Sequence, residues 1–242
     1  MKSFTKKDIR SLSLEDLRCF FTENKVQAFR GNQVYQWLWQ KGIHSFEGMT
    51  NLSKSNRALL KEHFVINHID IDHQQKSNDG TIKNAVKLYD NLVVESVLIP
   101  TANRTTACVS SQVGCSLDCK FCATAKIKRM RNLNADEIYD QVVSIDRQSR
   151  LYFDRPLSNI VFMGMGEPLM NYKNLINAIE KITQKDGLGM SPSRITVSTS
   201  GIPKIIMKMA DDQVRFGLAV SLHSARQNVR AKLMPFAEKF PL

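Results

Sequence analysis

The chain lacks a long apolar stretch. Nowhere in its 242 residues does a run of about 18 consecutive apolar side chains occur, the length that a helix needs to span a bilayer. The first residues, MKSFTKKDIRS, are polar and pass directly into a helical pattern, which argues against a secretory signal peptide. We therefore expect a cytoplasmic protein without a membrane partner.

Acidic residues are fewer than basic residues. The sequence has 23 Asp and Glu against 34 Lys and Arg, which gives a formal net charge of +11. Because 43% of the residues are hydrophobic and 24% are charged, the composition is that of a folded chain and excludes a disordered one. The positive excess favours a nucleic-acid partner, since Lys and Arg gain affinity by releasing counterions from phosphates. A soluble protein that is merely basic is the simpler alternative.

Cysteine is scarce too, and four of the five cysteines lie within residues 108–126, CVSSQVGCSLDCKFCATAK. Cys115, Cys119 and Cys122 have the spacing C-x3-C-x2-C, which in the cytosol indicates metal binding or catalysis rather than disulfides. No second C-x-x-C occurs, so a closed zinc site would have to recruit Cys108 or a distant histidine. An iron–sulfur cubane normally takes four thiolates, so three would leave one iron open to an outside ligand.

The first 65 residues predict an all-helical domain. Ser13-Leu14-Glu15-Asp16 resembles a capping box that opens the first helix. The second helix, NQVYQWLWQK, places Val34, Trp37 and Leu38 on one face, and a third runs through NRALLKEHF.

Two features of these helices concern function. Cys19, the fifth cysteine, lies beside Phe20 and Phe21, and we predict that it is a buried structural thiol. Trp37 and Trp39 could stack on nucleic-acid bases. Helical spacing favours core packing instead for Trp37.

Residues 66–100 change to a strand-like composition. Asp79-Gly80 and Asp90-Asn91 are hairpin-type turns, and VKLYDNLVVESVLIP carries β-branched residues on both sides of the second turn. The segment predicts a small β-meander that links the helical domain to the rest of the chain.

From residue 101 to residue 242 strand-like and helical patterns alternate. The apolar runs TTACVSS, NIVFMG, RITVSTS and FGLAVSLH are separated by helical patterns at 134–150, 172–184 and 202–211, the first opened by an Asn134-x-x-Glu137 cap. Such repetition predicts the α/β class, with right-handed crossovers and a parallel sheet. Ligands bind at the carboxyl ends of parallel strands. Polar or glycine residues lie at these ends: Ser110, Gly164, Ser198, Ser221 and His223.

Two motifs together resemble the signature of radical S-adenosylmethionine (SAM) enzymes. One is the cysteine triplet with Phe121 before its last member, and the other is GMGEP at 164–168, after the second strand-like run. The resemblance implies a (β/α) TIM-like barrel, partial in this chain. It also implies that Cys115, Cys119 and Cys122 hold a [4Fe-4S] cluster. In such enzymes the amino and carboxylate groups of SAM chelate the open iron, and an electron from the cluster cleaves SAM to a 5′-deoxyadenosyl radical.

The resemblance extends to one family of this superfamily, the dual-specificity ribosomal and transfer RNA adenine methyltransferases. CVSSQVGC, FCATAK, RNL, GMGEP, VSTSG and SLHS occur in the order and spacing of that family. It implies methylation of adenine carbon 2 in 23S rRNA, at the peptidyl transferase centre, and in tRNA, at position 37 of the anticodon loop. Two SAM molecules and a methyl-cysteine intermediate are implied, because carbon 2 and the SAM methyl group are both electrophilic. We also expect a monomer and a low-potential electron donor such as flavodoxin or ferredoxin.

The family pattern assigns SAM-binding positions at the strand ends. These are Gly166, Glu167, Ser198, Ser221, Leu222 and His223, with Ser200 as a neighbour. Glu167 would accept hydrogen bonds from the SAM ammonium group. Taken without the resemblance, His223 is equally well explained as a structural histidine, and Gly164-x-Gly166 as a simple strand-to-helix turn.

Two further residues match catalytic positions of the family. Glu95 in VESVLIP matches a proton acceptor, and among its valine and leucine neighbours it would hold a proton more tightly if it were buried. The alternative is a solvent-facing strand residue. Cys108 matches a cysteine that resolves the protein–RNA adduct through a transient disulfide; the alternative is a small buried hydrophobic residue.

Other segments bear on the choice of substrate. KIKRMR at 126–131 could approach phosphates, although a charge run is most often a solvated loop. Val113 and Pro168 resemble the carbon-2 enzymes more than the related carbon-8 adenine methyltransferases, which remain an alternative. A non-catalytic RNA-binding module with a cluster or zinc is the alternative from a different class.

The sequence departs from the family pattern at its end. It stops at PFAEKFPL, and no cysteine follows Cys122, whereas the family continues through further strands that carry an asparagine of the SAM site and the methyl-carrying cysteine. We therefore expect this chain by itself to bind a cluster, and SAM weakly, but not to methylate RNA. We also expect an open sheet edge at the fourth barrel strand, and poor solubility as its result.

Overall fold

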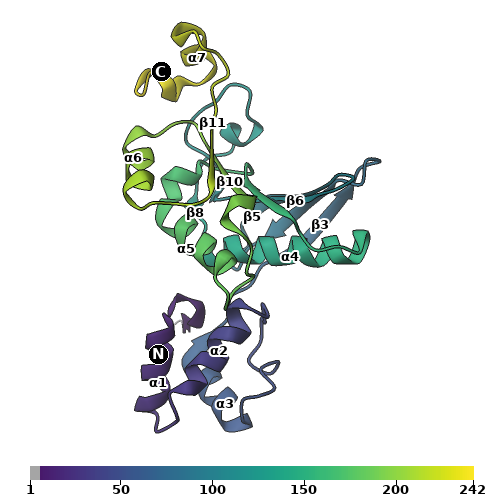
Figure 1. Cartoon of the computed structure of the whole chain (residues 1–242), viewed down its shortest axis with the longest axis vertical. Coiled ribbons are helices and arrows are strands. Elements are labelled where there is room, and N and C mark those ends of the chain that lie inside the picture. The colour runs from purple at the N-terminus through teal and green to yellow at the C-terminus, as the bar shows by residue number, and fades with distance from the viewer. Residues whose placement is uncertain (1–5) are drawn as a thin grey trace. The chain divides into compact units, whose positions relative to one another are not determined.

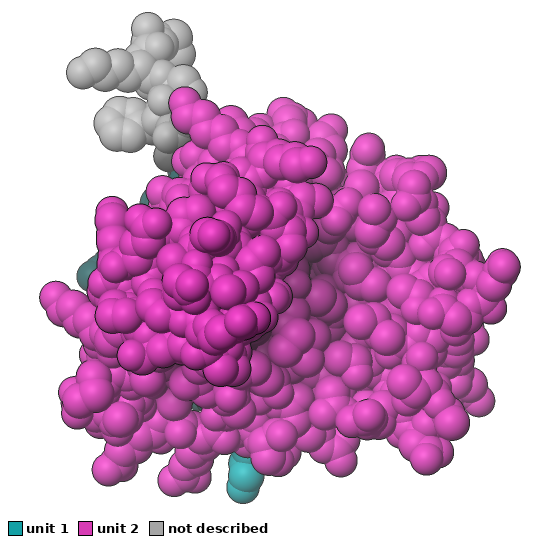
Figure 2. Space-filling model, turned by 90° about the horizontal axis from the view of Figure 1, so that it is seen from above, with its two compact units in different colours: residues 1–68, 181–189 teal, residues 69–180, 190–242 magenta. Residues whose placement is uncertain are grey.

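The computed structural model describes residues 6–242; residues 1–5, part of the polar N-terminal stretch, lie outside the described residues. The chain divides into two compact units. Unit 1 contains the described residues up to His68 together with Lys181–Gly189, and unit 2 contains Ile69–Glu180 and Met190–Leu242 (Figure 2).

Unit 1 is helical. Its elements are the two-residue strand β1 (Lys7–Asp8), the helices α1 (Leu14–Glu23), α2 (Phe29–Trp39) and α3 (Lys54–His63), and β2 (Phe64–Val65), which pairs in parallel with β1. The capping box is confirmed, since Ser13 Oγ accepts from the Asp16 amide at 3.1 Å and Asp16 Oδ2 accepts from the Ser13 amide at 2.9 Å. The helices enclose an apolar core of Leu17, Phe21, Val34, Leu38, Trp39 and Leu60.

Two predictions about unit 1 are wrong. Cys19 is exposed, because the buried side of α1 is set by Leu17 and Phe21, one turn apart, and Cys19 points away from both. The burial of the two tryptophans also differs from the expectation that Trp37 packs in the core. Trp39 is only 2% exposed and belongs to the core, whereas Trp37 is half-buried, donates to Asn51 Oδ1 at 2.5 Å and carries the Lys41 ammonium 3.8 Å above its ring.

Unit 2 is built on one seven-stranded sheet in the order β11-β10-β9-β6-β5-β4-β3 (Figure 1). Its strands are β3 (Asp70–Lys76), β4 (Ile82–Lys87), β5 (Val93–Pro100), β6 (Thr105–Cys108), β9 (Asn159–Phe162), β10 (Ile195–Thr199) and β11 (Gly217–Val220). The last four pair in parallel, and β3, β4 and β5 form the expected antiparallel meander. The meander is continuous with the parallel strands, because β5 pairs antiparallel with β6.

Helices connect the parallel strands. They are α4 (Ala135–Phe153), α5 (Tyr172–Thr183) and α6 (Pro203–Asp211), followed after β11 by α7 (Gln227–Leu233). The long helix α4 packs against β5 and β6 (Figure 1). Its expected cap is present, since Glu137 Oε2 accepts from the Asn134 amide at 2.8 Å. The predicted α/β class is confirmed, and β6, β9, β10 and β11 direct their carboxyl ends to one edge of the sheet.

In the described part of the chain, no helix combines the length and the apolar character that a bilayer crossing would need.

Candidate functional site

The three clustered cysteines lie in a loop whose base is closed by a short strand pair. β7 (Gln112–Val113) pairs antiparallel with β8 (Arg131–Asn132). Beyond the two strands, the Cys115 amide donates across the loop to the Ile127 carbonyl at 3.3 Å. We call residues 114–130 the cysteine loop. Its ends are fixed by backbone hydrogen bonds, so the loop is anchored to the sheet edge rather than free.

Gly114 makes this tight closure possible. Its φ is +72°, and a Cβ atom there would lie 2.4 Å from the Lys128 carbonyl oxygen. An L side chain would therefore be strained twice, by the left-handed backbone and by the opposite strand of the loop.

The three thiols influence one another electrostatically. All are free and partly buried. The pKa of Cys119 is raised to about 11, first by burial and then by the charges of Cys115 and Cys122, with Glu167 adding to the effect. Burial is also the main cause that raises the pKa of Cys115. Cys115 and Cys119, whose pKa values are raised, are therefore suited to a shared cationic partner that stabilises their thiolates.

The donor set of the cysteine loop is three thiols. Within residues 6–242, no three His, Cys, Asp or Glu side chains converge as the ligands of one metal ion would. A cubane distributes its ligands over separate iron atoms, so its thiolates need not meet at one point. Three thiols match the protein ligands of an iron–sulfur cubane with one iron left open, whereas a closed tetrahedral zinc site would need a fourth ligand.

The Gly-Glu motif lies directly beside the base of the cysteine loop. Gly166 has φ +96°, and a Cβ atom there would be 2.5 Å from the Cβ of Gln112. The Glu167 amide donates to Gln112 Oε1 at 2.9 Å, and Gln112 Nε2 donates to Asn132 Oδ1 at 2.7 Å. Gln112 is completely buried, and its side-chain amide links the Gly-Glu motif to β7 and β8, the two strands that close the loop.

The Glu167 carboxylate is buried, at 3% exposure, and well supplied with donors. Oε1 accepts from the Leu169 amide at 3.0 Å and from the Thr199 hydroxyl at 2.7 Å, and Oε2 accepts from the Ser200 amide at 2.8 Å. A carboxylate offers about four acceptor positions, so one on Oε2 remains for a ligand. An ammonium group is the ligand such a buried anion suits best.

The end of β11 also reaches the cysteine loop. The imidazole of His223, in the left-handed conformation at φ 56°, packs on the ring of Phe121 with centroids 4.0 Å apart. The Ser221 amide donates to the Thr199 carbonyl at 2.8 Å, and Leu222 is half-exposed. Ser198 precedes Thr199 in β10, so its side chain lies on the opposite face of the strand from the one that binds Glu167.

Glu95 is not buried, which is the alternative stated for it above. Its side chain is 53% exposed, and Oε1 lies 3.1 Å from the ammonium of Lys83. Its backbone is nevertheless tied to the neighbourhood of the Gly-Glu motif, because its carbonyl accepts from Ser110 Oγ at 2.6 Å and its amide donates to Met165 Sδ at 3.3 Å. The Glu95 side chain therefore faces solvent, while its backbone lies beside the Gly-Glu motif.

Cys108 ends β6 and is a half-buried free thiol. It pairs in the sheet with Val97 on one side and Val161 on the other. Burial raises the pKa of this thiol. It therefore lies at the same edge of the sheet as the Gly-Glu motif, but outside the cysteine loop.

Comparison with known proteins identifies both units. Residues 109–237 match the model of the radical SAM superfamily, and residues 7–66 match the N-terminal domain of ribosomal RNA large subunit methyltransferases. A probable dual-specificity RNA methyltransferase RlmN from Flavobacterium psychrophilum is 71% identical over 98% of this chain and 68% of its own length. The chain belongs to the RlmN family.

Two further proteins resemble the chain over nearly its whole length. The dual-specificity RNA methyltransferase RlmN of Geotalea uraniireducens is 42% identical, with 98% of this chain and 67% of that protein covered. The crystal structure of a radical SAM methyltransferase from Sphaerobacter thermophilus superposes with a TM-score of 0.89 at 34% identity, over 98% of this chain and 69% of that one. The predicted radical SAM fold is confirmed, and the chain is that of a methyltransferase whose family uses SAM and a [4Fe-4S] cluster.

The RlmN motifs contain site residues that the sequence interpretation overlooked. Gln112 lies in CVSSQVGC and Thr199 in VSTSG, and both serve Glu167 as described above. Asn171 is buried and donates to the carbonyls of Ser111 and Leu133, both at 2.8 Å. The only signal in the sequence is that Gln112 and Thr199 are polar residues within motifs and that Asn171 follows GMGEP by three residues, and this does not say which partner each residue binds.

The residues of the basic run KIKRMR differ in exposure and in pairing. Residues 126–130 are exposed, but Arg131 is not available to phosphates. Its guanidinium binds Glu137 through two hydrogen bonds of 2.8 Å and Asp90 at 2.6 Å. The expectation that the whole run approaches phosphates is therefore corrected for its last residue.

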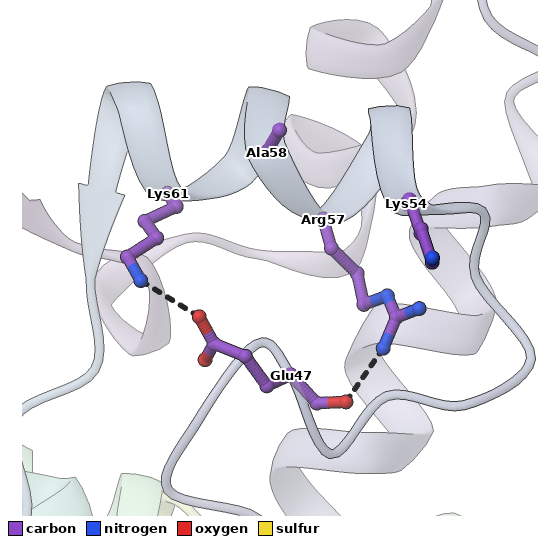
Figure 3. Close-up of a pocket in the computed structure, with 5 residues that line it drawn as sticks. All are labelled: Glu47, Lys54, Arg57, Ala58 and Lys61. Carbon is purple, nitrogen blue, oxygen red and sulfur yellow. Dashed lines mark hydrogen bonds and ion pairs between the residues drawn. The ribbon is translucent and has the colours of Figure 1, made fainter.

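A second group of cations lies on α3 in unit 1. Lys54, Arg57 and Lys61 follow one another at helical spacing and, with Ala58 and Glu47, line a shallow pocket (Figure 3). Lys61 binds the Glu47 carboxylate and Arg57 binds the Glu47 carbonyl, each at 2.7 Å. We call Lys54, Arg57 and Lys61 the α3 basic face; Lys54 and Lys61 are exposed, and Lys54 is the first residue of the helix.

Proposed function

We propose that this protein methylates carbon 2 of adenine in RNA, with 23S rRNA at the peptidyl transferase centre and tRNA at the anticodon loop as substrates. The observation that carries the proposal is the buried Glu167 carboxylate, joined through Gln112 to the base of a loop with three free thiols. Its RlmN relatives are named dual-specificity RNA methyltransferases, which supports both RNA substrates.

In this proposal Cys115, Cys119 and Cys122 hold the [4Fe-4S] cluster. When bound, the cluster supplies the electron for reductive cleavage of SAM, and a flavodoxin or ferredoxin replenishes it. Glu167 accepts hydrogen bonds from the SAM ammonium with its remaining position on Oε2. Gly166 keeps the backbone free of a side chain there, and Ser198, Ser221, Leu222 and His223 line the rest of the SAM site.

Two residues outside the cysteine loop serve the RNA chemistry. Carbon 2 of adenine and the methyl group of SAM are both electrophilic, so direct polar transfer between them fails and a methyl-cysteine route with two SAM molecules is needed. Cys108 resolves the protein–RNA adduct by attacking the sulfur of the family's methyl-carrying cysteine, which is not among residues 1–242, so that a transient disulfide forms as the sulfur–carbon bond to the RNA breaks. Glu95 accepts the proton lost from the adenine ring, and its exposure leaves it accessible to an RNA base.

Unit 1 contributes RNA binding in this proposal. We propose residues 1–65 as an RNA-binding domain, residues 66–100 as a linker and residues 101–242 as the catalytic core. The α3 basic face would neutralise RNA phosphates, since the family model that matches residues 7–66 belongs to ribosomal RNA methyltransferases.

The product decides between the candidate reactions. RNA from a strain that lacks its own enzyme and is complemented with the complete gene should contain 2-methyladenosine by mass spectrometry of nucleoside digests. Finding 8-methyladenosine instead would assign the protein to the related carbon-8 reaction.

The metal content tests the site itself. Protein purified without oxygen should be brown and contain about four irons and four sulfides per chain. Cys119→Ala should lose this absorbance, whereas Cys108→Ala should retain it. A colourless protein with stoichiometric zinc would instead support a non-catalytic RNA-binding module.

A further inference from the structure

Arg230 is a buried cation in the middle of α7. Its exposure is 3%, and within residues 6–242 no carboxylate lies at ion-pair distance from its guanidinium. Its Nε is buried without a hydrogen-bond partner among the described residues. Burying an arginine without a counter-ion costs free energy. The hydrogen bonds of its two Nη atoms must therefore offset that cost.

These contacts are main-chain carbonyls at the ends of two strands. Nη2 donates to the Ser200 carbonyl at 2.9 Å and, more weakly, to the Ser221 carbonyl at 3.5 Å. Nη1 donates to the Phe240 carbonyl at 3.3 Å. Because Ser200 follows β10 and Ser221 follows β11, one guanidinium connects the two loops at the carboxyl edge of the sheet. The planar fork of arginine can bind both carbonyls, which the single ammonium of lysine does less well.

Ser200 is held from both sides. Its carbonyl accepts from Arg230, and its amide donates to Glu167 Oε2 at 2.8 Å. That oxygen carries the acceptor position left for a ligand. A shift of the Ser200 backbone would therefore change both the orientation of Glu167 and the direction of its free acceptor.

The same helix also reaches the cysteine loop. The carbonyl of Leu233, the last residue of α7, accepts from the Lys120 amide at 2.9 Å. Lys120 lies between Cys119 and Phe121, so α7 holds the cysteine loop at one point and the two strand-end loops through Arg230.

We propose that Arg230 is a positioning residue for SAM binding: it fixes the Ser200 and Ser221 carbonyls and thereby holds Glu167 in the orientation that accepts the SAM ammonium. This rests on the proposed assignment of Glu167 to SAM. It predicts that Arg230 affects SAM affinity without itself touching SAM or the cluster.

The test compares three variants of the anaerobically reconstituted full-length protein. Arg230→Met removes the charge and keeps most of the side-chain volume, and Arg230→Lys keeps the charge but not the fork. Gln227→Ala is the matched control, since Gln227 also lies on α7 and donates to a main-chain carbonyl, that of Ala237, away from the strand ends. Iron content, the Tm and the Kd for SAM are measured for each.

For Arg230→Met we expect wild-type iron content and a SAM Kd raised about tenfold, the effect of losing a hydrogen bond to a charged donor. Arg230→Lys should lie between wild type and Arg230→Met, and Gln227→Ala should bind SAM as wild type does. A folded Arg230→Met with wild-type SAM affinity would overturn the proposal. If that variant does not fold, wild-type SAM affinity in Arg230→Lys overturns it. A wild-type protein that fails to bind SAM would instead refute the proposed function.

Discussion

At the scale of single residues, the site depends on positions where a side chain has no room. Gly114 and Gly166 both adopt positive φ, and at each a Cβ atom would meet a neighbour at 2.5 Å or less. Gly114 allows the two sides of the cysteine loop to approach each other, and Gly166 allows the Gly-Glu motif to approach Gln112 at the base of that loop. Their close approach, rather than general flexibility, is what the site requires of them.

Gly114→Ala should disrupt the cysteine loop. The left-handed backbone and the contact with the Lys128 carbonyl together should cost more than about 2 kcal/mol of local stability. We expect lower iron incorporation and a lower Tm. Gly189→Ala is the control, because Gly189 also has positive φ, +67°, but open space around it, so only about 1 kcal/mol of strain is expected and iron content should not change. Equal iron content in the two variants would contradict this role of Gly114.

Asp90 should make stability depend on acidity. The hydrogen bond from Arg131 lowers the pKa of Asp90 below its ordinary value. A lowered carboxyl pKa stabilises the fold above the unfolded value of about 3.9, and this contribution is lost as the pH falls through the folded pKa. Urea unfolding should therefore show wild type more stable than Asp90→Asn near neutral pH, with a difference that shrinks below about pH 4. A difference that stays constant to about pH 2 would disagree with this linkage.

Residue-level predictions from the sequence fail where the partner comes from elsewhere in the fold. Helical spacing favours burial of Trp37, yet the packing of the helices places Trp39 in the core instead. The exposure of Glu95 depends on the strand face and on Lys83 of the neighbouring strand, which spacing alone does not reveal. The cysteine spacing and GMGEP, by contrast, are local patterns, so they indicate the site directly.

At the scale of elements, polar pairs as well as apolar packing fix the helices on the sheet. Asn84 in β4 and Gln148 in α4 are buried and exchange two amide hydrogen bonds, of 3.0 and 2.8 Å. The strands, helices and turns themselves follow from sequence periodicity. The pairing of Asn84 with Gln148 does not follow from periodicity, because the sequence around either residue does not identify its partner.

A double-mutant cycle on this pair should be strongly non-additive. Asn84→Leu or Gln148→Leu alone leaves the other amide buried without its partner, which should cost about 1–3 kcal/mol. The double variant removes both polar groups, so its loss of unfolding free energy should be well below the sum of the single losses. Additive losses would mean that the two amides stabilise the fold independently.

At the scale of the whole molecule, the positive charge excess should act through particular surfaces. Lys54→Glu on the α3 basic face should weaken RNA binding and reduce the slope of log affinity against log salt by about one. Because Lys54 is the first residue of α3, an acidic replacement complements the helix dipole and should not destabilise the helix.

Lys204→Glu is the matched control for this surface. Lys204 is likewise an exposed lysine in the first turn of a helix, α6, and lies outside the proposed RNA surface. RNA binding that falls equally in both variants would point to net charge alone and would remove the α3 basic face from the proposal.

The strand order of the sheet bears on how the protein is made. From β3 to β11 each strand of this sheet pairs with the strand of the same sheet that follows it along the chain, β7 and β8 forming a separate pair. β3 to β6 need only short loops to pair, whereas β9, β10 and β11 each follow a helical crossover (Figure 1). The sheet can therefore grow in one direction as the polypeptide leaves the ribosome, with β3–β5 as the template for each strand that emerges after them.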